Sequence, residues 1–318
     1  MDTNIAFALA GLGGFNAHGA GFLTAARELQ VTPDLITATS GQIVVLAEWI
    51  RGSNLETLLV DSGHRPGIAG TFEIALTGLP GVFRPAIAEY WLRWHALPKS
   101  WADLAARLIP AQEYVPLRSK AYLQEISDLL NGTSMGAVFN AYNPTTGDGT
   151  LFGNDTAQKL LQSTKIEPIT AEAVESALWL SLYGFEQIPS DRMDGAYHRP
   201  CVIAELHNFE KIFSVRPLAR GWHGAPPRSW FDVQDWQCEM WFSSGYAAEV
   251  ADMKRINRLI ETGFLNDPRY KKIELVEVCT DHPCGYFNFF TERPQVFRAA
   301  YDAAISALSS QHGSCQKC

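Results

Sequence analysis

The fold of this chain is decided by residues 5–49, which read IAFALAGLGGFNAHGAGFLTAARELQVTPDLITATSGQIVVLAEW. The uncharged run from Ile5 to Ala10 ends in glycines and is typical of a strand buried on both faces. Apolar residues recur near helical spacing after Gly19, and Leu35–Ala38 is a second short apolar run. The stretch therefore predicts strand, helix and strand at the start of an α/β fold with a largely parallel sheet.

Ser40 follows the second predicted strand and precedes a predicted buried helix, Gln42–Ile50, which Gly52 closes. A serine on a sharp strand-to-helix turn presents its hydroxyl at the carboxyl edge of the sheet, beside a helix N-terminus that favours negative charge. The glycine-rich loop at residues 11–14 follows the neighbouring strand and can turn backbone N–H groups toward the same point. Ser40 is thus a candidate nucleophile facing candidate oxyanion donors.

Other interpretations of these residues compete with this one. A serine in front of a helix is most often only an N-cap. A dinucleotide-binding loop needs a third glycine where Asn16 stands, and an acidic residue at the end of the second strand, whereas Asp34 precedes that strand. A P-loop is excluded because no Gly-Lys-Ser/Thr sequence follows the glycines.

The composition is that of a folded protein without a strong charge bias toward nucleic acid. The chain has 318 residues, of which 47% are hydrophobic and 19% charged, and its formal net charge is -8. Its length allows a sizeable core, and its acidity argues against nucleic acid as the main partner. No run reaches the ~18 to 20 apolar residues that span a bilayer, and no basic residue precedes Arg27, as a signal peptide would require. We therefore expect a cytoplasmic protein, with peripheral membrane contact left open.

The cysteines are scattered and predict neither disulfides nor a metal site. The only close pairs are Cys279 with Cys284 and Cys315 with Cys318. A zinc site would need two pairs at tighter spacing, or one pair together with paired histidines. We expect reduced thiols, no metal and no cofactor.

Residues 53–134 are predicted to be a helical insertion. Trp91, Trp94 and Trp101 alternate there with leucines, and prolines divide the segment into short pieces. Such a segment could be a lid or a lipid-facing surface, but packing of the tryptophans onto the sheet is the interpretation we favour.

The rest of the chain continues the α/β pattern as a single domain over residues 1–318. The predicted elements are a hairpin at 135–142 and 150–153, helices at 171–183, 202–208, 248–262 and 294–309, and strands at 211–215 and 272–279. Residues 218–250, with tryptophans among glycines and prolines, are predicted to form a cap or a long loop. An Asp-Gly pair at Asp194 usually marks only a tight turn.

The order of these motifs resembles the patatin-like phospholipase family. That family carries a glycine-rich loop after the first strand, a Gly-x-Ser-x-Gly elbow after the second, and Asp-Gly-Gly/Ala much later. Here Gly11–Asn16, Ala38–Gln42 and Asp194–Ala196 stand in that order, and the resemblance covers most of residues 5–217. It implies a three-layer α/β/α patatin-like fold.

The resemblance also implies a lipid acyl hydrolase, a serine hydrolase of the phospholipase A, lysophospholipase or carboxylesterase type. Ser40 would be the nucleophile and Asp194 the general base of a Ser-Asp dyad that forms an acyl-enzyme. Gly41 would belong to the elbow, and the oxyanion hole would be formed by Gly11, Gly13 and Gly14. The implied partner is a lipid or acyl-ester substrate, with no cofactor.

The chain departs from the family pattern at several positions. Phe15 replaces the basic residue of the loop and Asn16 its last glycine, while Ala38 and Gln42 replace the elbow glycines. A catalytically weak or inactive relative, acting as a lipid-binding or interaction module, is therefore the alternative. A Ser-His-Asp hydrolase using His198 or His207 is the competing enzyme class. His18, in the exit of the loop, is expected to be a surface or capping residue.

Overall fold

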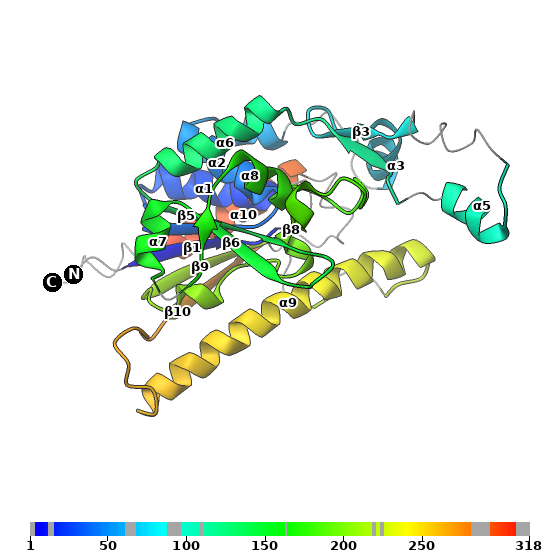
Figure 1. Ribbon diagram of the computed structural model, residues 1–318. Coiled ribbons are helices and arrows are strands. Elements are labelled where there is room, and N and C mark those ends of the chain that lie inside the picture. The colour runs from blue at the N-terminus through cyan, green and yellow to red at the C-terminus, as the bar shows by residue number, and fades with distance from the viewer. Residues whose placement is uncertain are drawn as a thin grey trace.

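The computed structural model describes residues 4–11, 16–60, 68–87, 97–108, 111–162, 164–217, 221–222, 226–280 and 293–309. These form a mixed α/β fold in which helices flank a mostly parallel sheet on both sides (Figure 1). The opening stretch folds as predicted into β1 (Ile5–Leu9), α1 (Ala17–Glu28), β2 (Leu35–Ala38) and α2 (Gln42–Arg51). Gly52 ends α2 in a left-handed conformation, with φ of 89°.

The central sheet has the order β10-β9-β1-β2-β5-β6-β7, and β8 pairs with β5 outside this path. The later strands are β5 (Gly136–Tyr142), β6 (Gly149–Gly153), β7 (Glu167–Pro168), β8 (Met193–Asp194), β9 (Lys211–Arg216) and β10 (Glu274–Cys279). Strands β10, β9, β1, β2 and β5 run parallel, and β6 returns antiparallel beside β5. Strand order reverses beside β1, and ligands of open α/β sheets bind at the carboxyl ends of strands at such a point.

Strand β1 is buried on both faces, as predicted. Phe7 and Leu9 point into one hydrophobic core, and Ala6 and Ala8 point into the other. The helices over the first core are α1, α2, α6 (Lys120–Gly132), α8 (Ala171–Ala177) and α10 (Arg293–Ser309), whereas α7 (Asp155–Leu160) and α9 (Trp230–Glu261) cover the second. Figure 1 shows α9, in yellow, on the opposite side of the sheet from α1, α2 and α10.

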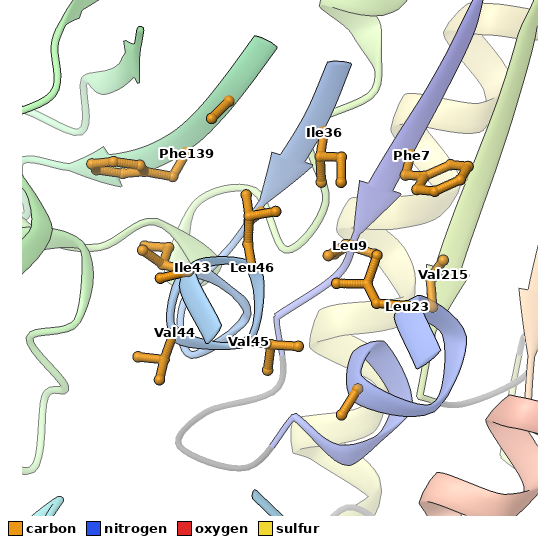
Figure 2. Packing of buried hydrophobic residues seen from close by; sticks show 14 of the residues in the cluster. Phe7, Leu9, Leu23, Ile36, Ile43, Val44, Val45, Leu46, Phe139 and Val215 are labelled. Atoms are coloured by element: carbon orange, nitrogen blue, oxygen red, sulfur yellow. The ribbon is translucent and has the colours of Figure 1, made fainter. Parts of the chain in front are cut away.

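The first core joins three adjacent strands to the helices of the opening stretch. Figure 2 shows Phe7, Ile36 and Phe139, one from each strand, near Leu23 of α1 and Leu46 of α2. Full burial of such a side chain stabilises a fold by ~1.5 to 3 kcal/mol. This packing fixes the ends of β1 and β2 relative to each other.

The segment predicted as a helical insertion contains strands as well as helices. It comprises η1 (Glu56–Val60), α3 (Ile68–Thr77), β3 (Phe83–Pro85), α5 (Trp101–Leu108) and β4 (Tyr114–Pro116), followed by α6, and β3 pairs antiparallel with β4. Helix α6 buries Leu123, Ile126 and Leu130 in the first core, so it is part of the main helical layer. Trp101 is 87% exposed, so the prediction of packed tryptophans is wrong for that residue. Trp91 and Trp94 lie outside the described residues.

The long loop predicted at 218–250 is wrong for most of that segment, because α9 begins at Trp230, whereas a role as a cap stays a prediction. Ser229 and Asp232 form a capping box, in which Ser229 Oγ accepts from the Asp232 amide at 3.2 Å and Asp232 Oδ2 accepts from the Ser229 amide at 2.9 Å. Tyr246, Val250 and Met253 then bury one helical face in the second core. The helix predicted at 248–262 is the C-terminal part of α9.

Two other predicted helices are shortened by tertiary hydrogen bonds. Helix α8 ends at Ala177, because the Trp179 carbonyl accepts from the Asp194 amide at 3.0 Å and the chain turns there. The helix predicted at 202–208 is only a 3-10 turn, η4 (Ala204–Leu206). Glu249 Oε2 accepts from the Ile203 and Ala204 amides at 3.2 and 2.9 Å, which supplies those amides with a partner outside any helix.

No helix in the described part of the chain is both long and apolar enough to cross a bilayer.

Candidate active site

Ser40 lies at the carboxyl end of the sheet, on the turn between β2 and α2. Its φ is 59°, a left-handed conformation that is uncommon for a residue with a side chain. Gly41, the N-cap of α2, has an ordinary φ of -59°. The strained residue of the turn is therefore the serine itself, as expected where a strand-to-helix turn presents a nucleophile.

Gly11 allows the end of β1 to lie directly against this turn. A Cβ at Gly11 would be 2.8 Å from Ser40 Cβ and 2.9 Å from the Thr39 carbonyl oxygen, so no side chain fits there. The Gly11 N–H donates to the Pro200 carbonyl oxygen at 2.8 Å. Gly11 thus allows the backbone after β1 to lie close to Ser40. Because its N–H is bonded to the Pro200 carbonyl oxygen, it is not available in this structure as the predicted oxyanion donor. Gly13 and Gly14 lie outside the described residues.

Asp194 reaches Ser40 because β8 pairs antiparallel with the end of β5, where Ala141 is its partner. The Ser40 hydroxyl donates to Asp194 Oδ2, and the Ala196 amide donates to Oδ1 at 2.8 Å. Both Ser40 and Asp194 are 1% exposed. The two side chains named from the sequence are therefore brought together, with the carboxylate held from both sides.

Asn140 of β5 explains why a glycine follows Asp194. A Cβ at Gly195 would lie 2.4 Å from Asn140 Cγ and 2.5 Å from the Asn140 carbonyl oxygen. The Asn140 amide in turn donates to the Arg199 carbonyl oxygen at 2.9 Å. Asn140 is a positioning residue that the sequence analysis missed, because nothing in its local pattern distinguishes it from other strand residues.

Burial raises the pKa of Asp194 to about 7, and this effect exceeds the opposing ones. The hydrogen bonds from Ser40 and from the Ala196 amide, and the charge of Arg118, act in the other direction. A carboxyl group with a pKa near neutrality can both accept and return a proton at physiological pH. Arg118, which lies between β4 and α6, was also missed by the sequence analysis.

Gln42, in place of an elbow glycine, is directed toward α1. A Cβ at Gly19 would lie 1.9 Å from Gln42 Oε1, so the glycine makes room for the amide. Gln42 Nε2 lies 2.7 Å from His18 Nε2, which is also 2.7 Å from the Ala10 carbonyl oxygen. The prediction of a surface or capping role for His18 is wrong, since it is fully buried, and burial lowers its pKa to about 4.

The histidines of the competing triad point elsewhere. His198 stacks on Tyr142 with ring centroids 6.2 Å apart, and His207 stacks on Tyr270 at 4.7 Å. The Asp194 oxygens contact Ser40 and the Ala196 amide instead. The geometry thus presents a hydroxyl and a carboxyl group as a pair.

Within the described ranges, no three His, Cys, Asp or Glu side chains are grouped so as to hold a metal ion. Cys201 and Cys238 are free thiols. Cys284, Cys315 and Cys318 lie outside those ranges.

No protein-family model and no curated protein sequence matches this chain. Among solved structures, VipD from Legionella pneumophila is similar to it at 12% sequence identity and a TM-score of 0.37. The alignment covers 96% of this chain and 66% of that chain, so this chain spans a little under two thirds of its length. A likeness at this level carries no statement about activity, and the fold class rests on the topology of the sheet itself.

Proposed function

We propose that this protein hydrolyses carboxylic esters of lipids, with Ser40 as nucleophile and Asp194 as general base. The observation that carries the proposal is the hydrogen bond from the Ser40 hydroxyl to the buried Asp194 carboxyl group. It is supported by the left-handed conformation of Ser40 at the carboxyl ends of the parallel strands.

The proposed reaction has two halves that use the same pair. As Ser40 Oγ attacks the ester carbonyl, Asp194 accepts its proton, and it then delivers that proton to the departing alcohol. The acyl-enzyme is hydrolysed when a water attacks the same carbonyl and gives its proton to Asp194. Asp194 returns that proton to Ser40 Oγ as the carboxylic acid leaves, which restores the starting state.

Negative charge on the carbonyl oxygen requires backbone donors near Ser40. Because the Gly11 N–H is bonded to Pro200, we assign the donors to Gly13 and Gly14 of the same loop. The N-terminus of α2 adds a favourable dipole. A single such donor is typically worth ~3 to 4 kcal/mol in the transition state.

A lipid substrate class is supported by large apolar side chains on the surface. Exposed residues of this kind include Leu97, Trp101 and Leu108 in and before α5, and Trp230 and Trp241 on α9. Figure 1 shows α5 and the N-terminal end of α9 at the same end of the molecule. Exposed apolar surface often marks contact with a membrane or another protein, and here we propose peripheral contact with a lipid surface.

Intact-mass spectrometry after incubation with a fluorophosphonate probe tests the proposal. We expect one adduct on the wild-type protein, none on Ser40→Ala, and turnover of acyl esters that both Ser40→Ala and Asp194→Asn abolish. Ser127→Ala is the matched control, because Ser127 is also a buried serine but lies in α6. Persistence of the adduct or of turnover in Ser40→Ala would refute the assignment of the nucleophile.

Two observations favour the alternative, a lipid-binding or interaction module without turnover. Ser40 is almost fully buried, and the Gly11 N–H is already bonded. Absence of an adduct on the wild-type protein, together with binding to phospholipid vesicles, would favour this alternative over the hydrolase.

A further inference from the structure

Arg118 is a partly buried cation beside the candidate dyad. It directly precedes Ser119, whose hydroxyl caps α6 by accepting from the Tyr122 amide at 3.2 Å. Among the described residues, none forms a hydrogen bond or an ion pair with the Arg118 guanidinium. Other partly buried arginines do have such partners, with Arg192 lying 3.0 Å from Glu167 and Arg199 2.7 Å from Glu205.

Tyr183 presents a second polar group without a partner at the same place. Its side chain is 3% exposed and packs with Phe83 and Trp179, while its buried hydroxyl has no hydrogen-bond partner in the described part of the chain. Buried hydroxyls are rarely left unsatisfied, so this one is available to a bound ligand. Arg118, Tyr183 and Asp194 act on one another electrostatically.

The backbone fixes these groups in one cluster. The Glu113 and Tyr114 amides at the start of β4 both donate to the Leu182 carbonyl oxygen, at 2.9 and 3.0 Å. Gln112 and Tyr183 form a bridge beside this contact, and Met193, next to Asp194, packs in the same hydrophobic cluster as Tyr183. The strand that leads to Arg118 and the turn that carries Tyr183 are therefore held together, and Tyr183 lies in the same hydrophobic cluster as the residue before Asp194.

Asp194 does not supply the Arg118 guanidinium with a hydrogen-bond or ion-pair partner. Its two oxygens are engaged by Ser40 and the Ala196 amide, and it forms no ion pair with the guanidinium. A guanidinium offers five N–H donors in a planar fork that matches a phosphate or a carboxylate. A phenolic hydroxyl nearby adds one more donor to the same anion.

We propose that Arg118 and Tyr183 form a subsite for a phosphate group. In the substrate, this phosphate group would lie close to the ester bond that Ser40 attacks. The subsite makes Arg118 a specificity-determining residue, because it selects acyl esters that carry a phosphate a short distance from the reacting carbonyl. This inference rests on the proposed function for its link to catalysis, but binding of phosphate itself does not.

The kinetic test compares two esters with the same acyl chain, a monoacylglycerol and its 3-phosphate. Rates are measured at pH 8.5, above the pKa of Asp194 of about 7. Because both esters are compared on the same variant, a change in the ionised fraction of Asp194 cancels in the ratio of their kcat/KM values. For Arg118→Gln we expect the ratio of kcat/KM for the phosphate ester to that for the neutral ester to fall about tenfold to a hundredfold, mainly through KM. Tyr183→Phe lowers the ratio less, and Arg118→Lys gives an intermediate value.

Arg192→Gln is the matched control, because Arg192 is also partly buried but is paired with Glu167. Its ratio should equal that of the wild type. An unchanged ratio in Arg118→Gln, or an equal loss for both esters, would overturn the proposal.

Calorimetry on Ser40→Ala separates the subsite from the hydrolase proposal, since no turnover is needed. We expect glycerol 3-phosphate to bind Ser40→Ala and Ser40→Ala/Arg192→Gln, and to lose at least tenfold in affinity for Ser40→Ala/Arg118→Gln. If binding depends on Arg118 but the wild-type protein turns over no ester, the result would support the subsite and refute the hydrolase proposal. Inorganic phosphate is then titrated into Ser40→Ala. If it binds more weakly than glycerol 3-phosphate, the subsite is assigned to a lipid headgroup, and if it binds equally well, to free phosphate. If neither compound binds, the proposal is overturned.

Discussion

At the scale of single residues, the candidate site combines a strained serine with a carboxyl group that burial keeps close to neutrality. A left-handed conformation costs a residue with a Cβ about 1 to 2 kcal/mol. Ser40 is held in it by packing against Gly11 and by its hydrogen bond to Asp194. Strain of this kind collects at functional sites, where the surrounding structure maintains it.

The pH dependence of ester turnover should follow the ionisation of Asp194. The base form is the carboxylate, so kcat/KM for a neutral ester should rise with pH and level off above the pKa of about 7. Among the described residues, the other groups that act on Asp194 are Arg118, whose pKa burial lowers, and Tyr142, Tyr183 and Tyr197, whose pKa values burial raises. A profile from pH 5 to 9 checks this, and a flat profile would contradict it.

Arg118→Gln should move this profile in a defined direction. The charge of Arg118 lowers the pKa of Asp194, so its removal should shift the acidic limb to higher pH. The same measurement on Arg192→Gln, which lacks this effect on Asp194, serves as the control.

Gln42 and Gly19 should behave as an energetically coupled pair. Gly19→Ala places a Cβ on the buried Gln42 amide and should lower the free energy of unfolding by ~1 to 3 kcal/mol. In the background of Gln42→Ala the same change should cost much less, because the obstructing amide is gone. Urea unfolding of the two single variants and the double variant gives the coupling energy. If the losses of the two single variants instead add up in the double variant, Gly19→Ala does not act through the Gln42 amide, and the prediction is wrong.

At the scale of elements, the first helical layer depends on a backbone contact between α1 and α10. A Cβ at Gly21 would lie 2.3 Å from the Phe297 carbonyl oxygen and 3.0 Å from the Tyr301 amide nitrogen. Neither backbone atom can rotate away as a side chain can. The two helices must therefore separate if any side chain is introduced at this position.

Gly21→Ala should accordingly destabilise the protein by ~3 kcal/mol or more, beyond the usual range for overpacking by one methyl group. Gly132→Ala is the matched control, since Gly132 is also helical but a Cβ there would meet nothing within 4 Å. We expect it to be neutral or to stabilise by up to ~1 kcal/mol. Chemical denaturation of both variants measures the difference, and equal stabilities would refute close packing of α1 on α10.

At the scale of the whole molecule, the fold brings together two residues 154 positions apart and excludes water from both. Burial of the Asp194 carboxyl group opposes its ionisation. The entire folded state therefore bears a free-energy cost at any pH where this group is charged.

Asp194→Asn should remove that cost, and the gain should grow with pH. The ordinary value for Asp is 3.8 and the folded pKa is about 7, so the unfolded chain releases this proton first as pH rises. This group makes the wild type lose stability between those two values, whereas the neutral amide of the variant does not titrate. The difference between the two proteins should widen from pH 4 to pH 7 and stay constant above, with an upper bound of about 4 kcal/mol. Urea unfolding at pH 5 and pH 8 checks this, and a gap that narrows toward pH 8 would contradict it.

The local pattern of the sequence by itself determined most regular elements and made Ser40 a candidate nucleophile, whereas Asp194 was named only by the resemblance in motif order. Uncharged, largely apolar runs predicted β1 and β2, because strands buried on both faces seldom hold charged side chains. The strands predicted at 211–215 and 272–279 correspond to β9 and β10. Helical spacing predicted α1, α2 and α10 in the same way. The capping box before α9 is also readable at Ser229 and Asp232, but the tryptophans, glycines and prolines around it favoured a loop.

Only the tertiary structure decided which distant groups meet. Pairing of β8 with β5 places Asp194 against Ser40, and the contact of β4 with the Leu182 turn places Arg118 near both. Two other features depend equally on distant segments. The Gly11 N–H is bonded to Pro200, and Glu249 accepts from the amides of the segment predicted as a helix at 202–208, which shortens that helix. Local periodicity indicates which side chains of one segment are buried and which are exposed. The contacts above depend instead on how separate segments pack against each other. They therefore cannot be predicted from any single stretch of sequence.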